Sequence, residues 1–210
     1  MNKTIIKEIE KKEKAEILDI EIKSFSKNLK KIDLIVYSSA IAEDNPEIIY
    51  GKKTGIPVIK RAEMLANLMT MKKSIAIAGS HGKTTTSGML CWALDQVGFD
   101  FSYLVGGLFL GNELAPGRYS KDSWLVLEVD ESDGTIDLFA PTITLALNCE
   151  WDHVDLYDSK DSIGETFRSL FNRTRSAIIT PNKSELSDWA KLEKNQKKVI
   201  NNFKKILRNN

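Results

Sequence analysis

One segment limits what this chain can fold into more than any other: IAIAGSHGKTTTSGML, which runs from Ile75 to Leu90. Mostly apolar residues, suited to a buried strand, lead into Gly-Ser-His-Gly-Lys-Thr, and apolar residues then return at helical spacing. We expect a helix that closes at Gly98 and whose apolar face carries Met89, Leu90, Ala93, Leu94 and Val97. The segment therefore predicts a strand, a tight glycine loop and a helix in direct succession.

The loop has the composition of a phosphate-binding site. The first N–H groups of a helix lack intrahelical partners and carry a positive partial charge, which attracts anions. Gly79 and Gly82 allow the backbone to curl closely around such an anion. Lys83 can reach the outer phosphates of a nucleotide, and a threonine hydroxyl beside it can hold Mg²⁺.

Only the Gly-Lys-Thr core of the phosphate-loop motif is present, because Ile77 stands where the full pattern has a glycine. The alternative interpretation is a simple helix cap, with Ser80 or His81 at the turn and Lys83 in solvent. The preceding strand and the following helix favour nucleotide phosphate over the cap.

Further strands and helices alternate along the chain, which predicts an α/β fold with a parallel sheet. We expect a parallel-sheet P-loop ATPase domain, preceded by a partial Rossmann-like α/β domain. The expected strands lie within 31–41, 56–60, 72–80, 102–107, 123–131, 141–149 and 176–180, and the other helices at 45–55, 61–70 and 162–175. The expected domains are 1–71 with a linker, 72–183, and a Lys- and Asn-rich tail over 184–210 that forms a solvated helix at best or is frayed.

Composition excludes several classes of protein. A net charge of +1 gives no reason to expect a nucleic-acid partner. No apolar run is long enough to cross a bilayer, and the first residues lack the apolar core of a secretion signal. Cys91 and Cys149 lie in apolar contexts and are expected to be small core residues, so we expect a cytoplasmic protein without a membrane partner.

Polar side chains follow two other predicted strands, at the sheet edge where open parallel sheets bind ligands. They are Glu128, Asp130, Glu131 and Asp133 after one strand, and Asn148, Glu150, Asp152, His153 and Asp155 after the other. Carboxylates beside a triphosphate repel it unless a divalent cation lies between them, so these oxygens are candidate Mg²⁺ ligands. Solvated acidic loops are the alternative. We expect Glu128 and His153 to lie on adjacent strand ends that face Thr84.

The segments GSHGKTTTSGML, EVDESDG and NCEWDHVDLY together resemble the ATP-loop, acidic and Asn–Asp–His motifs of the Mur ligases of peptidoglycan synthesis. YSSAIAEDNPEI, GIPVIKRAEMLANLM and YLVGGL are also similar to segments of that family. The resemblance covers about residues 31–180. It is strongest to members that join L-alanine to UDP-N-acetylmuramate, and members that recycle a muropeptide tripeptide are the alternative.

The resemblance implies a role for each matching residue. Lys83 would bind the ATP phosphates, Thr84 a first Mg²⁺ and His153 a second, and Glu128 would bridge the two metals; Lys83, Glu128 and His153 would be the catalytic set. Substrate contacts would come from His81, Asp130, Ser132 and Asp133. The nucleotide site would comprise Gly79, Ser80, His81, Gly82, Lys83, Thr84, Thr85 and Asn148.

The family chemistry is the activation of a substrate carboxylate as an acyl phosphate, followed by attack of an amine, and it requires positioning and charge neutralisation. The chain departs from the family pattern in having no glycine before Gly51 and in ending soon after 176–180. We therefore expect a truncated member that is not active alone. Three hypotheses follow: a ligase completed by a separate chain that supplies the C-terminal domain, an ATP-binding module without ligase activity, and an inactive remnant.

Overall fold

The computed structural model separates into two compact units, Met1–Met64 and Leu65–Asn210. The structure describes residues 32–110, 114–122, 124–130, 135–150, 160–182, 184–192 and 198–200. Among these residues, no helix is both long enough and apolar enough to cross a membrane.

The described part of the first unit is a β–α–β element. Strand β1 (Ile35–Tyr37) pairs in parallel with β2 (Val58–Lys60), and helix α2 (Pro46–Thr54) connects them. The helix begins after Asn45, whose side chain accepts a hydrogen bond from the N–H of Glu47 at 2.9 Å. The predicted strands and helix of this region are confirmed.

Of the two glycines expected near the end of α2, Gly55 terminates it, in a left-handed conformation with φ of 76°. Gly51 lies inside the helix and serves packing instead. A Cβ at Gly51 would lie 2.6 Å from Val58 Cγ2 and 2.7 Å from Ile35 Cδ1, so its absence lets α2 lie directly on both strands.

Helix α3 (Arg61–Met71) leads into the second unit, which is built on a seven-stranded sheet of order β5-β4-β6-β3-β7-β8-β9. All neighbouring strands in it are parallel except β5, which pairs antiparallel with β4. The elements after α3 are β3 (Lys73–Ala78), α4 (Lys83–Gln96), β4 (Ser102–Leu104), β5 (Gly117–Arg118), β6 (Trp124–Glu128), the 3₁₀ turn η2 (Ile136–Leu138), β7 (Ile143–Ala146), α5 (Lys160–Arg173), β8 (Ala177–Ile179), α6 (Glu185–Leu192) and β9 (Lys198–Ile200). The predicted parallel α/β architecture is confirmed.

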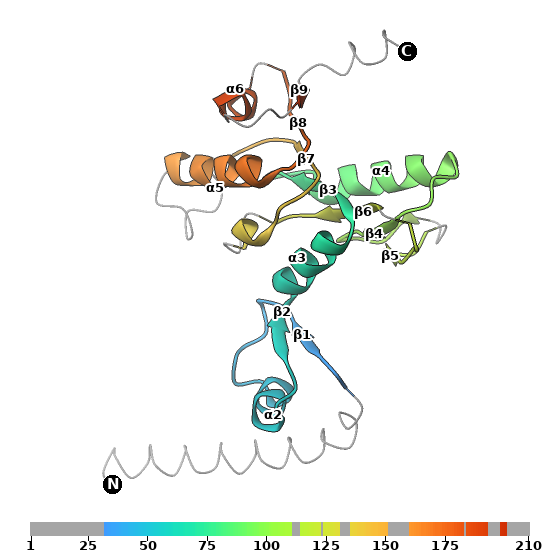
Figure 1. The fold of residues 1–210 in the computed structure, drawn as a ribbon, viewed down its shortest axis with the longest axis vertical. Coiled ribbons are helices and arrows are strands. Elements are labelled where there is room, and N and C mark those ends of the chain that lie inside the picture. The colour runs from blue at the N-terminus through green and yellow to red at the C-terminus, as the bar shows by residue number, and fades with distance from the viewer. Residues whose placement is uncertain are drawn as a thin grey trace. The chain divides into compact units, whose positions relative to one another are not determined.

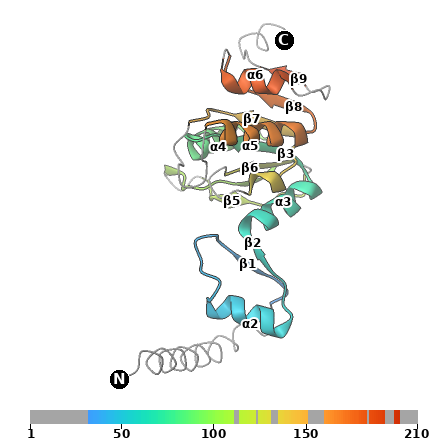
Figure 2. The same ribbon diagram turned by 90° about the vertical axis from the view of Figure 1, so that its left-hand side faces the viewer.

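Helices α4 and α5 cover opposite faces of this sheet (Figure 1; Figure 2). The chain moves from β3 toward β4 through α4, and in the other direction from β7 to β8 through α5. Right-handed crossovers that run in opposite directions must pass over opposite faces, so the arrangement follows from chain handedness. Strand β3 lies at the centre of the sheet, and the loop that follows it lies at the point where the chain direction reverses.

The face of α4 toward the sheet differs from the expected one. Ser87 and Cys91 are fully buried, and Leu90 and Leu94 pack beside them, whereas Met89 is 68% exposed. Val97 and Ala93, also expected on the apolar face, are exposed as well. The buried stripe is rotated because small side chains at 87 and 91 let the helix approach the sheet closely, which a count of large apolar residues does not reveal.

On the opposite face, α5 buries Ile163, Phe167, Leu170 and Phe171, at the spacing of one helical stripe. The side chain of Arg173 fastens the end of this helix to η2. Its guanidinium donates to the carbonyl oxygens of Phe139 at 2.9 Å and Ile136 at 3.0 Å. The helix expected over 162–175 is therefore confirmed, with observed bounds of Lys160–Arg173.

The expectation of a solvated or frayed segment from Ser184 is wrong for two elements. Helix α6 buries Leu186, Ser187 and Ala190, and β9 pairs in parallel with β8, with Val199 opposite Ile178. The Lys- and Asn-rich composition concealed both, since a three-residue strand and an eight-residue helix show too little periodicity to stand out. Strand β5, with two residues, was not predicted for the same reason.

Cys91 lies on the buried face of α4, and we expect its thiol to resist modification in the native protein. Burial raises the pKa of Cys91 from 9.0 to about 12, although the charge of Arg118 lowers it and that of Glu128 raises it by less. At pH 8 the native thiolate is therefore roughly a thousandfold rarer than that of an unfolded chain. In a Cys149→Ser variant, Ellman's reagent should react slowly at pH 8 until guanidinium unfolds the protein.

The same pKa predicts how stability depends on pH. Above about pH 9 the unfolded chain loses the Cys91 proton while the native chain keeps it, so this contribution to stability is lost as pH rises toward 12. A Cys91→Ala variant should lack this part of the loss of stability at alkaline pH. Native Cys91 reacting at the rate of a free thiol would contradict the prediction.

Candidate functional site

The predicted phosphate loop lies between β3 and α4, at the carboxyl end of the central strand. Gly79 and Gly82 have φ angles of 148° and 80°, in the region that side chains other than glycine rarely adopt. Gly82 is the N-cap of α4, and no side chain among the residues that the structure describes caps the helix there. The cap alternative, with Ser80 or His81 in this role, is therefore wrong, and the helix N-terminus opens onto the loop.

Gly79 is also required by packing. A Cβ at this position would lie 3.0 Å from Leu147 Cβ and 3.2 Å from both the backbone nitrogen and oxygen of Asn148. The loop thus lies directly against the segment that follows β7.

Two sets of hydrogen bonds join the loop to that segment. The Ser80 hydroxyl donates to the Glu150 carbonyl at 3.1 Å and accepts from the Glu150 N–H at 2.9 Å. The Asn148 side chain accepts from the His81 N–H at 2.8 Å and donates to the His81 carbonyl at 3.0 Å. At the surface, His81 Nε2 lies 3.5 Å from a carboxylate oxygen of Glu150.

Lys83 lies across the loop rather than in open solvent. Its Nζ donates to the Gly79 carbonyl at 2.7 Å and lies 3.6 Å from Asp130 Oδ1, and its side chain is only 16% exposed. The ammonium is therefore held over the loop and the N-terminus of α4, where it adds to the positive potential of the helix end.

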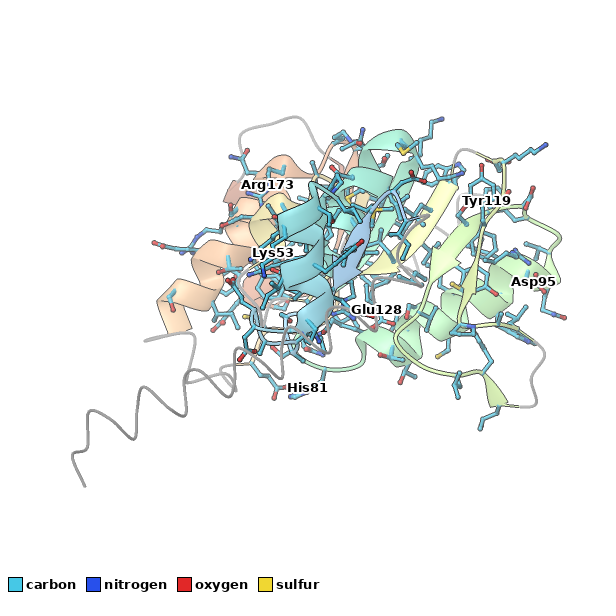
Figure 3. The ribbon with its side chains drawn as sticks, turned by 90° about the horizontal axis from the view of Figure 1, so that it is seen from below. Lys53, His81, Asp95, Tyr119, Glu128 and Arg173 are labelled. Carbon is cyan, nitrogen blue, oxygen red and sulfur yellow. The ribbon has the colours of Figure 1, made fainter. Side chains whose placement is uncertain are left out.

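Glu128, at the end of β6, is surrounded by hydrogen-bond donors. One carboxylate oxygen accepts from the Thr84 hydroxyl at 2.9 Å, and the other accepts from the Ser87 hydroxyl at 2.7 Å and the Gly106 N–H at 2.8 Å. The donors come from α4 and from the segment after β4, so three elements meet at this carboxylate. Figure 3 labels Glu128 and also His81 of the loop.

Gly106 and Gly107 bring the segment after β4 against Thr84. A Cβ at Gly106 would lie 3.1 Å from Glu128 Oε2, and one at Gly107 would lie 2.8 Å from Thr84 Cγ2. Ser87 and Gly106 were not among the predicted site residues. The signal for Ser87 was its position one helical turn after Lys83, and for Gly106 the two glycines that follow a predicted strand.

A hydroxyl and a carboxylate side by side are the ligands that Mg²⁺ prefers, so Thr84 and Glu128 fit a magnesium site. Within the described ranges, no three His, Cys, Asp or Glu side chains gather into a metal-binding group. The expected second-metal ligand, His153, and the expected substrate residues Ser132 and Asp133 lie outside the described residues.

The other predicted site residues are brought together as follows. Gly79 to Gly82 form the loop, and Lys83, Thr84 and the exposed Thr85 lie on the first turn of α4. Asn148 contacts the loop at His81, and Asp130 lies beside Lys83. Glu128 faces Thr84 as expected. The expectation that Glu128 and His153 follow adjacent strands is wrong, because β3 lies between β6 and β7. Their strands flank the loop from either side.

A parallel sheet whose central strand ends in a glycine loop, with a lysine and threonine opening the next helix, defines an α/β P-loop domain. Family comparison agrees: residues 77–205 match the Mur ligase middle domain, and residues 5–73 match the domain described as Mur ligase family, catalytic domain. The chain belongs to the Mur ligase family.

Relatives with established names are similar over much of this chain. The UDP-N-acetylmuramate–L-alanine ligase of Lawsonia intracellularis is 43% identical over 153 residues, which are 73% of this chain and 34% of the relative. That of Carboxydothermus hydrogenoformans is 40% identical over 171 residues, or 80% and 36%. The chain thus spans about a third of the length of the curated relatives it matches.

Solved structures share the fold. A UDP-N-acetylmuramate–alanine ligase from Thermotoga maritima has a TM-score of 0.68 at 24% identity, covering 80% of this chain and 39% of that one. A UDP-N-acetylmuramate:L-alanyl-gamma-D-glutamyl-meso-diaminopimelate ligase from Neisseria meningitides has a TM-score of 0.69 at 22% identity, covering 85% and 60%. At these identities the likeness supports the architecture alone.

Proposed function

We propose that this chain carries the ATP- and Mg²⁺-binding part of a ligase that joins L-alanine to UDP-N-acetylmuramate in peptidoglycan precursor synthesis. The observation that carries the proposal is the contact between the Thr84 hydroxyl and Glu128 at the mouth of the glycine loop, beside Lys83. A phosphate cradle, a cation and a pair of Mg²⁺-type oxygen ligands are what phosphoryl transfer from ATP requires. The names of the relatives at 40% identity or more support the choice of substrates.

In this proposal each residue has a defined task. Lys83 and the loop N–H groups bind the ATP phosphates, and Thr84 and Glu128 hold a Mg²⁺ that neutralises phosphate charge. His153 is proposed to hold a second Mg²⁺. Asp130, together with His81, Ser132 and Asp133, is proposed to face the muramoyl substrate.

The domain boundaries of the sequence analysis remain part of the proposal. We take 1–71 as part of a UDP-sugar-binding domain with its linker, and the segment from residue 72 as the ATP-binding domain, which we extend through α6 and β9. A cytoplasmic location is supported by Cys91 and Cys149, the two cysteines of the sequence, which are not joined in a disulfide, since reducing compartments keep thiols reduced.

The tripeptide-adding alternative is supported only by fold, through the Neisseria structure, and we therefore place it second. A third reading is an ATP-binding module. The 210 residues by themselves are expected not to form UDP-muramoyl-alanine, because the matched relatives use a chain about three times as long to hold both substrates. A separate chain that supplies a C-terminal domain would restore that positioning.

Calorimetric titration with a non-hydrolysable ATP analogue tests the proposed site. We expect Mg²⁺ to strengthen binding to the unmodified chain about tenfold or more, since a charged contact contributes about 1.5–3 kcal/mol. Glu128→Gln should lose this Mg²⁺ dependence while binding the metal-free analogue as before. Glu165→Gln, which changes an exposed carboxylate on α5, is the matched control. Equal binding in Mg²⁺ and in EDTA by the unmodified chain would overturn the proposed site.

A further inference from the structure

The Asn148 side chain uses both ends of its amide on a single peptide residue of the phosphate loop. Its oxygen accepts from the His81 N–H at 2.8 Å, and its nitrogen donates to the His81 carbonyl at 3.0 Å. The orientation of the amide is fixed by these partners, because a backbone N–H requires the oxygen and a backbone carbonyl requires the nitrogen. The two hydrogen bonds of Asn148 therefore form only when the His81 backbone has this orientation.

Neighbouring contacts make this bond pair part of a larger attachment. The N–H of Leu147 donates to the Ala78 carbonyl at 2.9 Å, which extends the β3–β7 ladder to the start of the loop. Ser80 exchanges two hydrogen bonds with the backbone of Glu150. Ala78, Ser80 and His81 are thus held from one side by Leu147, Asn148 and Glu150, which follow β7.

These contacts point to a role for Asn148 that differs from a direct nucleotide contact. A loop binds phosphate through the directions of its backbone N–H groups, and a loop of small residues with two positive φ angles has many alternative conformations when free. We propose that Asn148 is a positioning residue that orients the His81 peptide, and through it the loop, for the terminal phosphates. This inference rests on the proposed nucleotide site and deepens it.

The first test needs no nucleotide. Amide hydrogen exchange of His81 in the ligand-free chain should be slow in the unmodified protein and at least about tenfold faster in Asn148→Ala, because its hydrogen-bond acceptor is removed. The N–H of Leu147 has its own acceptor in Ala78 and should stay protected in both. Asn67→Ala, which removes an exposed asparagine from α3, is the matched control and should change neither amide. Unchanged exchange at His81 would overturn the proposal.

The second test compares the affinities of AMP and ADP in Mg²⁺. If Asn148 orients the loop, Asn148→Ala should weaken the binding of ADP by about tenfold and that of AMP by no more than about twofold, because only ADP places a second phosphate in the loop. If Asn148 instead contacts the base or ribose, both nucleotides weaken by the same factor, which would overturn the proposal. If Asn148→Ala does not fold, Asn148→Ser replaces it in this test, because the serine hydroxyl can keep one of the two hydrogen bonds. The ratio of the losses in ADP and AMP affinity then decides in the same way.

Failure of the proposed phosphate site and failure of the proposed positioning role give different results. If the unmodified chain binds ADP no more tightly than AMP, the proposed phosphate site is wrong, whatever the variants do. If the unmodified chain prefers ADP and Asn148→Ala keeps the same preference, the positioning role alone is wrong.

Discussion

Gly79→Ala is expected to destabilise the second unit by about 2–5 kcal/mol, the largest stability effect of any single methyl group in the loop. Two costs add. The φ of 148° is a conformation that alanine adopts only under strain, at about 1–3 kcal/mol. The new Cβ would also lie 3.0–3.2 Å from Leu147 Cβ and the backbone of Asn148. Backbone atoms within the β7 segment yield less readily than the end of a flexible side chain, so the strand connection itself must shift.

Urea denaturation followed by circular dichroism measures this loss, and Gly98→Ala is the matched control. Gly98 also has a positive φ, of 68°, but a Cβ there meets nothing within 4 Å. Its replacement should therefore cost only the left-handed strain, about 1–2 kcal/mol. If Gly79→Ala costs no more than Gly98→Ala, close packing of the loop against the β7 segment does not constrain the fold. Gly79→Ala should also weaken binding of a Mg²⁺–ATP analogue, whereas Gly98→Ala should not.

Lys83→Ala is expected to reduce affinity for the Mg²⁺–ATP analogue by about tenfold to a hundredfold, the range of one charged hydrogen bond. The ammonium is already held over the loop by the Gly79 carbonyl and Asp130, so little freedom is lost when a phosphate takes its place among these partners. Because the interaction is between charges, the advantage of the unmodified chain should shrink as salt is raised.

Lys121→Ala is the matched control, since it removes an exposed lysine between β5 and β6. It should leave the affinity within about twofold. Calorimetric titration in parallel at low and moderate salt distinguishes the two lysines. Equal affinity of Lys83→Ala and the unmodified chain would mean that this lysine does not bind phosphate, and the interpretation of the loop as a phosphate site would fail with it.

Local sequence was sufficient for the loop and for most of the elements around it. Gly79, Gly82 and Lys83 lie within five consecutive positions of the chain, so their geometry is governed by backbone sterics and by the start of one helix. The strands at 73–78, 124–128 and 143–146 were recognisable because burial on both faces demands continuous apolar runs. Short elements such as β5, β9 and α6 were not recognised, because a segment of so few residues shows no measurable hydrophobic periodicity.

What the tertiary structure decided is which distant groups meet at the loop. Glu128 gains its donors from residues 44, 41 and 22 positions away, and Asn148 meets His81 across 67 positions. The sequence alone placed Glu128 and Asn148 at strand ends, but it led to the wrong prediction that Glu128 and His153 follow adjacent strands. It also left open which backbone groups the side chains of Glu128 and Asn148 reach. Strand order settled this, because inserting β3 between β6 and β7 brings a carboxylate to one side of the loop and an amide to the other. Strand order depends on the packing of the whole sheet and its helices, a non-local energy that no short segment of sequence contains.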